Sequence, residues 1–310
     1  MKIGFFGTPD IGAFCLRALA REFEVLFAMT GEDKPAGRHR HLQASPVKQA
    51  ALELGVPVLQ PAKLRDEGFI GDLKKYPADA YVIVAYGKII PREIFDHPPL
   101  KTINLHPSLL PKYRGAAPVE WALMRGETET GITVQLINER LDEGDILAQK
   151  AIAVGSCMTA GELYDIVLPE GAALLADTLR RMAAGDITPR KQREEEALYC
   201  GKIDRELARV DWAKPAAEIH NLVRGLNPKP VAWTEFRGKT VHIWKTALPE
   251  DTGGMELAPG ELRVHARKRL LAGTGDGLIE ILSIQPETKK AMDGLSFING
   301  YRLQAGERLN

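Results

Sequence analysis

The sequence predicts an α/β protein: a mostly parallel sheet with covering helices, followed by a smaller β domain. Three observations lead to this prediction. Short apolar runs alternate with helical patterns through the first half, a polar stretch without periodicity surrounds residue 190, and closely spaced strand patterns with glycine turns fill the rest. Strands that alternate with helices usually pair in parallel, because each helix carries the chain back to the same end of the sheet.

The elements of the first part follow in strand, helix, strand order. A helix is predicted at 11–22, and a longer one at 159–185 begins with a capping box formed by Thr159 and Glu162. Pro169 should kink or split that longer helix, because proline cannot donate an internal hydrogen bond. The predicted strands are 2–6, 24–29, 79–86, 102–105, 131–137 and 148–154.

Length and composition predict two domains with separate cores. The 310 residues are 45% hydrophobic, and a chain of this size usually divides in two. We expect a first domain at 1–188, a linker at 189–206 and a second domain at 207–310. The second domain opens with a short helix behind Pro215, and its strands suggest a small antiparallel barrel or sandwich. These strands are 232–236, 240–244, 260–266, 269–274 and 278–285.

Charge and cysteine content exclude several classes of protein. Forty-one basic and forty-one acidic residues leave no net charge, so a polyanionic partner must be bound by local basic patches. The three cysteines are scattered without CxxC spacing, which argues against a disulfide framework and against a zinc site, and we expect no metal. No signal-peptide core or membrane-length apolar segment occurs, so a soluble, cytoplasmic protein is expected.

A candidate site lies at the end of the strand that contains Asn104 and His106. Side chains two residues apart on a strand share a face, and sites in parallel sheets gather where strands end. Asp142, in the acidic loop after the next strand, is our choice to hold the imidazole, while Asn104 and His106 stabilise an oxyanion. No serine or cysteine elbow accompanies them, so the nucleophile belongs to a substrate. The alternative is a buried histidine capped by its neighbour asparagine.

The segments NLHPSLLPKYRGAAP (104–118) and QLINERLDEGDIL (135–147) resemble the signature of folate-dependent formyltransferases, which use 10-formyltetrahydrofolate as formyl donor. The likeness runs through essentially the whole chain and is greatest to members that act on methionyl-tRNA. It implies a Rossmann-like formyltransferase domain and a C-terminal OB-like β-barrel that binds tRNA. Lys229 and Val231 stand where the family commonly has tryptophan and glycine. If that glycine serves a turn with positive φ, the loop must sit differently in this chain.

The resemblance also implies roles for individual residues. Asn104, His106 and Asp142 would be catalytic, and the main chain at Tyr86 and Gly87 would line the pterin pocket. The formyl group would pass to the α-amino group of initiator methionyl-tRNA, for translation initiation. The residues implied to lie along the folate are Ser108, Leu109, Leu110 and Pro111.

Two basic segments are candidates for contacts with tRNA phosphates. The first lies between Lys34 and Lys48, contains no acidic residue, and would form a cationic arm or an ordinary solvated loop. The second is 262–270, where alternate basic residues would share one face of an extended strand, unless a hairpin turn breaks the stripe. The candidate contacts are Lys34, Arg38, Arg40, Lys48, Arg263 and Arg267.

Two other functions compete with formylation of methionyl-tRNA. The same donor chemistry could act on a small amine, such as a nucleotide sugar or glycinamide ribonucleotide. A nicotinamide-dependent oxidoreductase is the third possibility, but the glycine turn at 7 lacks the G-x-G-x-x-G pattern of dinucleotide sites. The acid-free basic loop and the second domain favour tRNA. Because such a substrate is asymmetric, a monomer is expected.

Overall fold

The computed structural model describes residues 1–36, 41–252 and 254–310, and the chain forms two compact units. Unit 1 comprises Met1–Gly115, Gly131–Ile152 and Asp165–Tyr199. Unit 2 comprises Ala116–Thr130, Ala153–Tyr164 and Cys200–Asn310. The domain limits expected at 188 and 206 stay a prediction.

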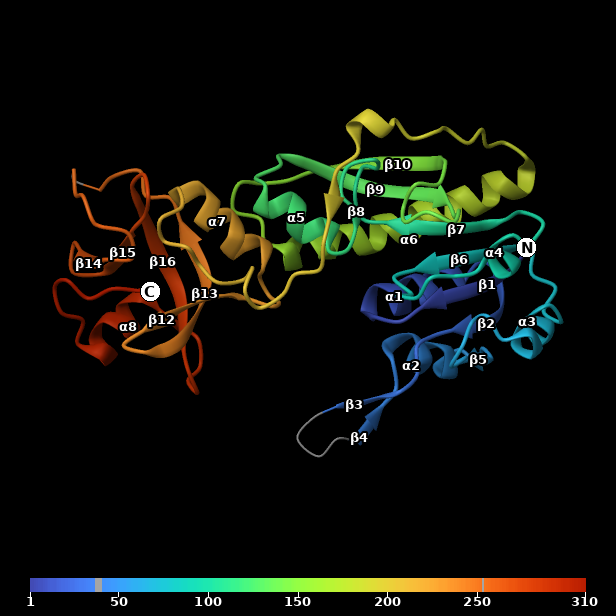
Figure 1. Ribbon diagram of the computed structural model, residues 1–310, viewed down its shortest axis with the longest axis horizontal. Coiled ribbons are helices and arrows are strands. Elements are labelled where there is room, and N and C mark those ends of the chain that lie inside the picture. Colours follow the sequence, from blue (N-terminus) through green and yellow to red (C-terminus); the bar gives the residue numbers. More distant parts are fainter. Residues whose placement is uncertain (37–40, 253) are drawn as a thin grey trace. The chain divides into compact units, whose positions relative to one another are not determined.

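Unit 1 is built on a seven-stranded sheet with the order β10-β9-β7-β6-β1-β2-β5 (Figure 1). The central pairs β2–β1, β1–β6 and β6–β7 are parallel, and β9 runs antiparallel to β7. The predicted α/β class with a mostly parallel sheet is therefore confirmed. The strands are β1 (Lys2–Gly7), β2 (Glu24–Met29), β5 (Val58–Leu59), β6 (Ala80–Val84), β7 (Thr102–His106), β9 (Glu129–Leu136) and β10 (Ile146–Ala153).

Packing of β7 decides which of its side chains are available for chemistry. Every residue of β6 and β7 is buried. Leu105 contacts Gly171 of α6 so closely that a Cβ on this glycine would lie 2.8 Å from the leucine side chain. Since successive side chains alternate, Asn104 and His106 lie on the other face of β7. The helices associated with this sheet are α1 (Asp10–Leu19), α2 (Pro46–Glu53), α3 (Glu67–Leu73), α4 (Arg92–Phe95) and α6 (Ala160–Ala184).

Helix α6 begins with the predicted capping box. The Thr159 N–H donates to Glu162 Oε2 at 2.8 Å, and the Glu162 N–H donates to Thr159 Oγ1 at 3.3 Å. Pro169 lies inside the helix, which continues to Ala184, so the prediction that it could split the helix is wrong. Gly185 follows with a φ of 70°, the conformation that commonly ends helices.

Replacing Thr159 by alanine is expected to lower the free energy of unfolding by about 1 kcal/mol at neutral pH, because the Glu162 N–H loses its acceptor and the Glu162 carboxylate loses the Thr159 hydroxyl donor. Hydrogen bonds from Thr159 lower the pKa of Glu162. The contribution of the box is therefore present above the ordinary carboxyl pKa and disappears as the pH falls through the lowered one. Chemical denaturation of both forms at neutral and acidic pH measures this. An equal difference at both pH values would contradict it.

A short antiparallel hairpin, β3 (Lys34–Ala36) and β4 (His41–Gln43), projects from unit 1 (Figure 1). Lys34 pairs with Gln43 at its base. The predicted contacts Arg38 and Arg40 lie outside the described residues. Both strands of the hairpin lie within the segment 34–48, which was predicted to form a cationic arm.

Unit 2 contains an antiparallel sheet with the order β12-β13-β16-β15-β14, and β17 pairs with β16. The predicted strands of the second domain are confirmed, whereas closure into an OB-like barrel stays a prediction. Phe236 and Phe297 pack edge to face in its core, with ring centroids 5.2 Å apart. The strands are β12 (Ala232–Phe236), β13 (Lys239–Ala247), β14 (Leu262–His265), β15 (Arg269–Gly273), β16 (Leu278–Pro286) and β17 (Met292–Asp293). The helices are α5 (Pro118–Met124), α7 (Ala216–Gly225) and α8 (Gly294–Tyr301).

Two details of unit 2 bear on the sequence analysis. The segment 262–270 turns back on itself, with positive φ at Ala266 and Arg267, so the hairpin alternative is the one observed and no continuous basic stripe forms. Val231 keeps a φ of 74°, the left-handed conformation that glycine adopts without steric cost. The valine therefore itself occupies a conformation that favours glycine, and whether the loop follows another path than in the family stays a prediction.

Candidate active site

The site is built on neighbouring strands of unit 1. On β7, Asn104 pairs with Gln135 of β9, and His106 pairs with Thr133. Residues directly opposite in an antiparallel pair share a face, so these four side chains lie on the same side of the sheet. The loop that follows β9 carries Asp142 back to this face.

His106 and Asp142 come together as the sequence analysis expected. Nδ1 of His106 lies 3.7 Å from Oδ1 of Asp142, and the two side chains are only 5% and 10% exposed. Nε2 of His106 lies 2.8 Å from the Tyr113 carbonyl oxygen. Because a carbonyl only accepts, Nε2 carries a hydrogen, and only the imidazolium can donate from both nitrogens. The ring can reach a substrate oxygen only after releasing one of these partners.

Asn104 has the environment of an unused hydrogen-bond donor. Its backbone is fixed between β6 and β9, and the residue is 8% exposed. No residue among 1–36, 41–252 and 254–310 forms a hydrogen bond with its side-chain amide. Because no side chain or main chain of the described residues occupies this amide, it is available to a ligand.

Asp142 is held in an unusual backbone conformation by hydrogen bonds. Its φ is 56°, in the left-handed region. The Gly115 N–H donates to Oδ2 at 2.9 Å, and Gln135 Nε2 donates to Oδ1 at 3.1 Å. Two residues further on, Gly144 lies so close to Leu136 that any Cβ would overlap the leucine carbonyl oxygen. Only glycine fits there, and the loop is thereby closed onto β9.

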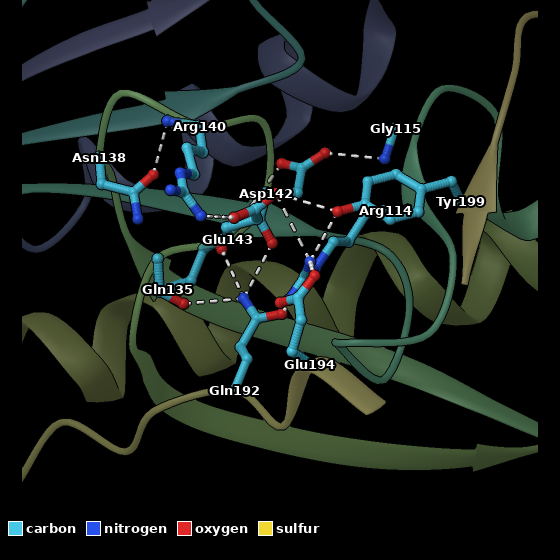
Figure 2. A network of polar contacts seen from close by, with 11 residues as sticks. Arg114, Gly115, Gln135, Asn138, Arg140, Asp142, Glu143, Gln192, Glu194 and Tyr199 are labelled. Carbon is cyan, nitrogen blue, oxygen red and sulfur yellow. Dashed lines mark hydrogen bonds and ion pairs between the residues drawn. The ribbon is translucent and has the colours of Figure 1, made fainter. Parts of the chain in front are cut away.

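A polar network that the sequence analysis did not predict surrounds this loop (Figure 2). Arg114 is 1% exposed and forms bidentate hydrogen bonds with Glu194, both 3.0 Å long. Its Nε donates to Gln192, which in turn reaches the main chain of Asp142. The segment 190–199, here called the strap, supplies Gln192 and Glu194. Backbone hydrogen bonds between Arg190 and Ile146 attach its first residue to β10.

The segment 108–111, implied to lie along the folate, is largely occupied by internal hydrogen bonds. Thr133 Oγ1 donates to the main-chain oxygen of Ser108 at 2.6 Å and accepts from the Leu110 N–H at 3.1 Å. Gln149 donates to the Leu110 oxygen at 2.9 Å. These contacts make it a rigid wall beside β7. Its buried members are Ser108, Leu110 and Pro111, whereas Leu109 is half-buried.

Tyr86 and Gly87 follow β6, which pairs in parallel with β1 in the sheet. Thr8, which follows β1, donates to the Tyr86 carbonyl oxygen at 3.1 Å and so joins the two strand ends. Burial raises the pKa of Tyr86 to about 12. Its hydroxyl is buried and has no hydrogen-bond partner among the described residues. Gly87 has a φ of 78° and open space where a Cβ would lie.

Some of the described candidates for tRNA contact already form an ion pair with a carboxylate of the protein. Lys48 donates to Asp33 at 2.7 Å, and this contact lowers the pKa of Asp33. Arg263 donates to Glu261 at 2.9 Å, and Arg267 lies in the turn between β14 and β15. Lys34 is exposed on β3. Paired cations contribute less to a phosphate site, because a phosphate must compete with the carboxylate.

The described residues contain neither a metal-binding cluster nor a membrane-spanning helix. No group of three histidine, cysteine or acidic residues among them could hold a metal ion. No described helix is long and apolar enough to cross a membrane. None of the three cysteines, Cys15, Cys157 and Cys200, forms a disulfide bond.

Comparison with known sequences matches both parts of the chain to one family. The description "Formyl transferase" applies to residues 1–179, and "Formyl transferase, C-terminal domain" applies to residues 202–302. The methionyl-tRNA formyltransferase of Clostridium novyi is 41% identical over 98% of this chain and 98% of its own length. That of Solibacter usitatus is 43% identical over 100% of this chain and 98% of its own.

Solved structures show the same fold at lower identity. An N-formyltransferase from Helicobacter canadensis, in complex with folinic acid and dTDP-3-aminofucose, superposes with a TM-score of 0.69 at 19% identity, covering 93% of this chain and 100% of that one. HypX from Aquifex aeolicus, in complex with tetrahydrofolic acid, gives 0.65 at 20%, where the match covers 99% of this chain and 48% of HypX. Together with the full-length sequence matches, this similarity shows that the chain belongs to the formyl transferase family.

Proposed function

We propose that this chain transfers a formyl group from 10-formyltetrahydrofolate to the α-amino group of initiator methionyl-tRNA. The observation that carries the proposal is the Asn104 amide, which has no hydrogen-bond partner among the described residues and lies on the same face of β7 as the His106–Asp142 pair. Relatives named methionyl-tRNA formyltransferase that match the whole chain support the choice of acceptor. We expect the enzyme to act as a cytoplasmic monomer.

In this reaction the amine nitrogen bonds to the formyl carbon, and the bond between that carbon and the folate nitrogen breaks. The amine loses a proton, and the folate nitrogen gains one. Negative charge develops on the formyl oxygen, and the Asn104 amide is the donor placed to stabilise it. His106, held by Asp142, supplies a second donor or accepts the proton of the amine. Holding both substrates together would contribute a further part of the rate.

The folate is proposed to lie between the ends of β6 and β7. The segment 108–111 would form a preorganised wall, since its main chain is already hydrogen-bonded to Thr133 and Gln149. Gly87 would allow the folate to approach the backbone, because it carries no side chain and faces open space. The unpartnered Tyr86 hydroxyl is a polar group that a pterin could use.

The tRNA is proposed to contact the arm at 34–48 and the β14–β15 turn. On the arm, tRNA phosphates would be bound by Lys34, Arg38 and Arg40. Lys48, because it is paired with Asp33, would act mainly by anchoring the base of that arm. Arg263 and Arg267 would contribute from separate parts of one hairpin, and Arg263 would first have to leave Glu261.

The decisive experiment compares acceptors at one concentration of formyl donor. Initiator methionyl-tRNA is expected to be formylated, with the rate falling steeply as salt rises, because phosphate contacts release counterions. Free nucleotide amino sugars and glycinamide ribonucleotide should remain unformylated. Preferential formylation of a small amine would replace the proposed acceptor while retaining the formyl-transfer chemistry.

A further inference from the structure

The Arg114 side chain is the starting point of a directed chain of hydrogen bonds in unit 1. Its Nε donates to Gln192 Oε1 at 3.0 Å. Its two terminal nitrogens contact Glu194, and one of them also donates to the Tyr199 hydroxyl at 2.8 Å. A guanidinium only donates hydrogen bonds and stays charged at any physiological pH. Arg114 therefore dictates which end of the Gln192 amide faces it.

The orientation of Gln192 decides that of Gln135. With its oxygen turned to Arg114, Gln192 presents Nε2 to three acceptors (Figure 2). These are the main-chain oxygens of Asp142 and Gly144, both at 2.8 Å, and Gln135 Oε1 at 3.2 Å. Gln135 must then use Nε2 toward Asp142 Oδ1, 3.1 Å away. The chain ends with a donor aimed at the carboxylate.

Arg114 shares the task of orienting this chain with the main-chain oxygens of Asp142 and Gly144, which can accept only from Gln192 Nε2. A reversed arrangement, in which both glutamine amides rotate by half a turn, loses these matched contacts. In the reversed arrangement the Gln135 oxygen faces the Asp142 carboxylate, and two acceptors repel each other. The Asp142 main-chain oxygen also loses its partner, at a residue whose φ of 56° already needs support.

We propose that Arg114 is a positioning residue, which acts through Gln192 and Gln135 to hold the Asp142 carboxylate beside His106. The proposal rests on the proposed function, in which Asp142 serves formyl transfer. The strap, which the sequence analysis treated as linker, would thus be part of the catalytic support. Neighbouring Glu143 strengthens this fixation, since it accepts from Tyr199 at 2.9 Å and lies 3.6 Å from Arg114.

Gln192→Glu is the sharpest test, because it keeps the side-chain shape and the contact with Arg114 but removes the donor. Changing Arg114 itself is a poorer probe, because Glu143 and Glu194 would lose their shared cation and folding could suffer. With initiator methionyl-tRNA, Gln192→Glu is expected to lower kcat by about 10- to 100-fold, as for a slightly misplaced catalytic group, with both Michaelis constants unchanged. Arg193→Ala, on the same strap but exposed and paired with Glu196 alone among the described residues, is the matched control and should retain wild-type kcat.

A double variant separates positioning from a general structural role. If Gln192 acts through Asp142, adding Gln192→Glu to Asp142→Asn should cause no further loss of kcat. Losses that multiply, or wild-type kcat in Gln192→Glu with an unchanged melting temperature, would overturn the positioning role while leaving the proposed function intact. Wild-type kcat in Asp142→Asn alone would remove Asp142 from the mechanism and overturn the positioning role, whereas absence of formylation by the wild-type enzyme would overturn the proposed function.

Discussion

Replacing Asp142 by asparagine is expected to lower kcat/KM for formylation of initiator methionyl-tRNA by about 10²- to 10⁴-fold, the range over which a positioned proton-transfer group contributes. The carboxylate faces His106 Nδ1 at 3.7 Å and is the group that can balance an imidazolium there. Asparagine has nearly the same shape and can still accept from the Gly115 N–H. The loss should therefore come from charge and not from a displaced loop.

Two observations would make the Asp142→Asn result interpretable. The variant should keep the wild-type melting temperature and folate affinity, since neither the core nor the segment 108–111 is altered. His106→Ala should lose activity to a similar extent, because the two residues act as one pair. Full turnover in either purified variant would remove the pair from the mechanism.

Replacing Asn104 by leucine should lower activity and leave stability nearly unchanged. Loss of one donor to a developing oxyanion typically lowers kcat by about 10²- to 10³-fold. Stability should stay level, because the Asn104 amide has no hydrogen-bond partner in the described parts of the chain that the substitution could remove.

The Asn104→Leu prediction is checked by steady-state kinetics together with chemical denaturation of the same preparation. Thr133→Val is a useful comparison on the neighbouring strand, since Thr133 forms hydrogen bonds within the protein and its loss should destabilise. Undiminished turnover in Asn104→Leu, or a marked fall in its stability, would show that the amide serves the fold.

The face of β7 could be predicted from sequence because it depends only on local geometry. Alternation along 102–106 places Asn104 and His106 together, and the strand, helix, strand order places them at the end of the sheet where sites form. Asp142 was chosen from its motif, since nothing local fixes where a loop residue points. The structure brings it to the imidazole, and its catalytic role is the prediction tested above.

The support of Asp142 could not be predicted, because it depends on contacts distant in sequence. Gln192 lies 50 residues from Asp142, in a strap that has no periodicity and few apolar residues to mark it as packed. Gln135 carried a weak signal, since it is the only amide side chain in its strand and lies opposite Asn104. Arg114, next to a glycine in a proline-rich loop, gave no indication that it would be buried.

In unit 2 the sequence left open whether 262–270 forms one strand or a hairpin, and it did not reveal the backbone conformation of Val231. Residues 266–268 could have continued a strand, and the turn follows from cross-strand pairing of His265 with Arg269. At Val231 the backbone has a φ of 74° although the residue is not glycine, and its side chain is buried. Tertiary packing therefore outweighs the local preference of valine, at a cost that the sequence does not reveal.

The most direct test of the proposed site is the single-turnover rate of formyl transfer, with both substrates saturating, in Asn104→Leu, His106→Ala and Asp142→Asn. Saturation removes differences in binding, so the rate reports the chemical step. Each variant should be slower than wild type by at least about 10²-fold. A wild-type rate in any of the three would exclude that residue from the reaction, and wild-type rates in all three would place the chemistry elsewhere.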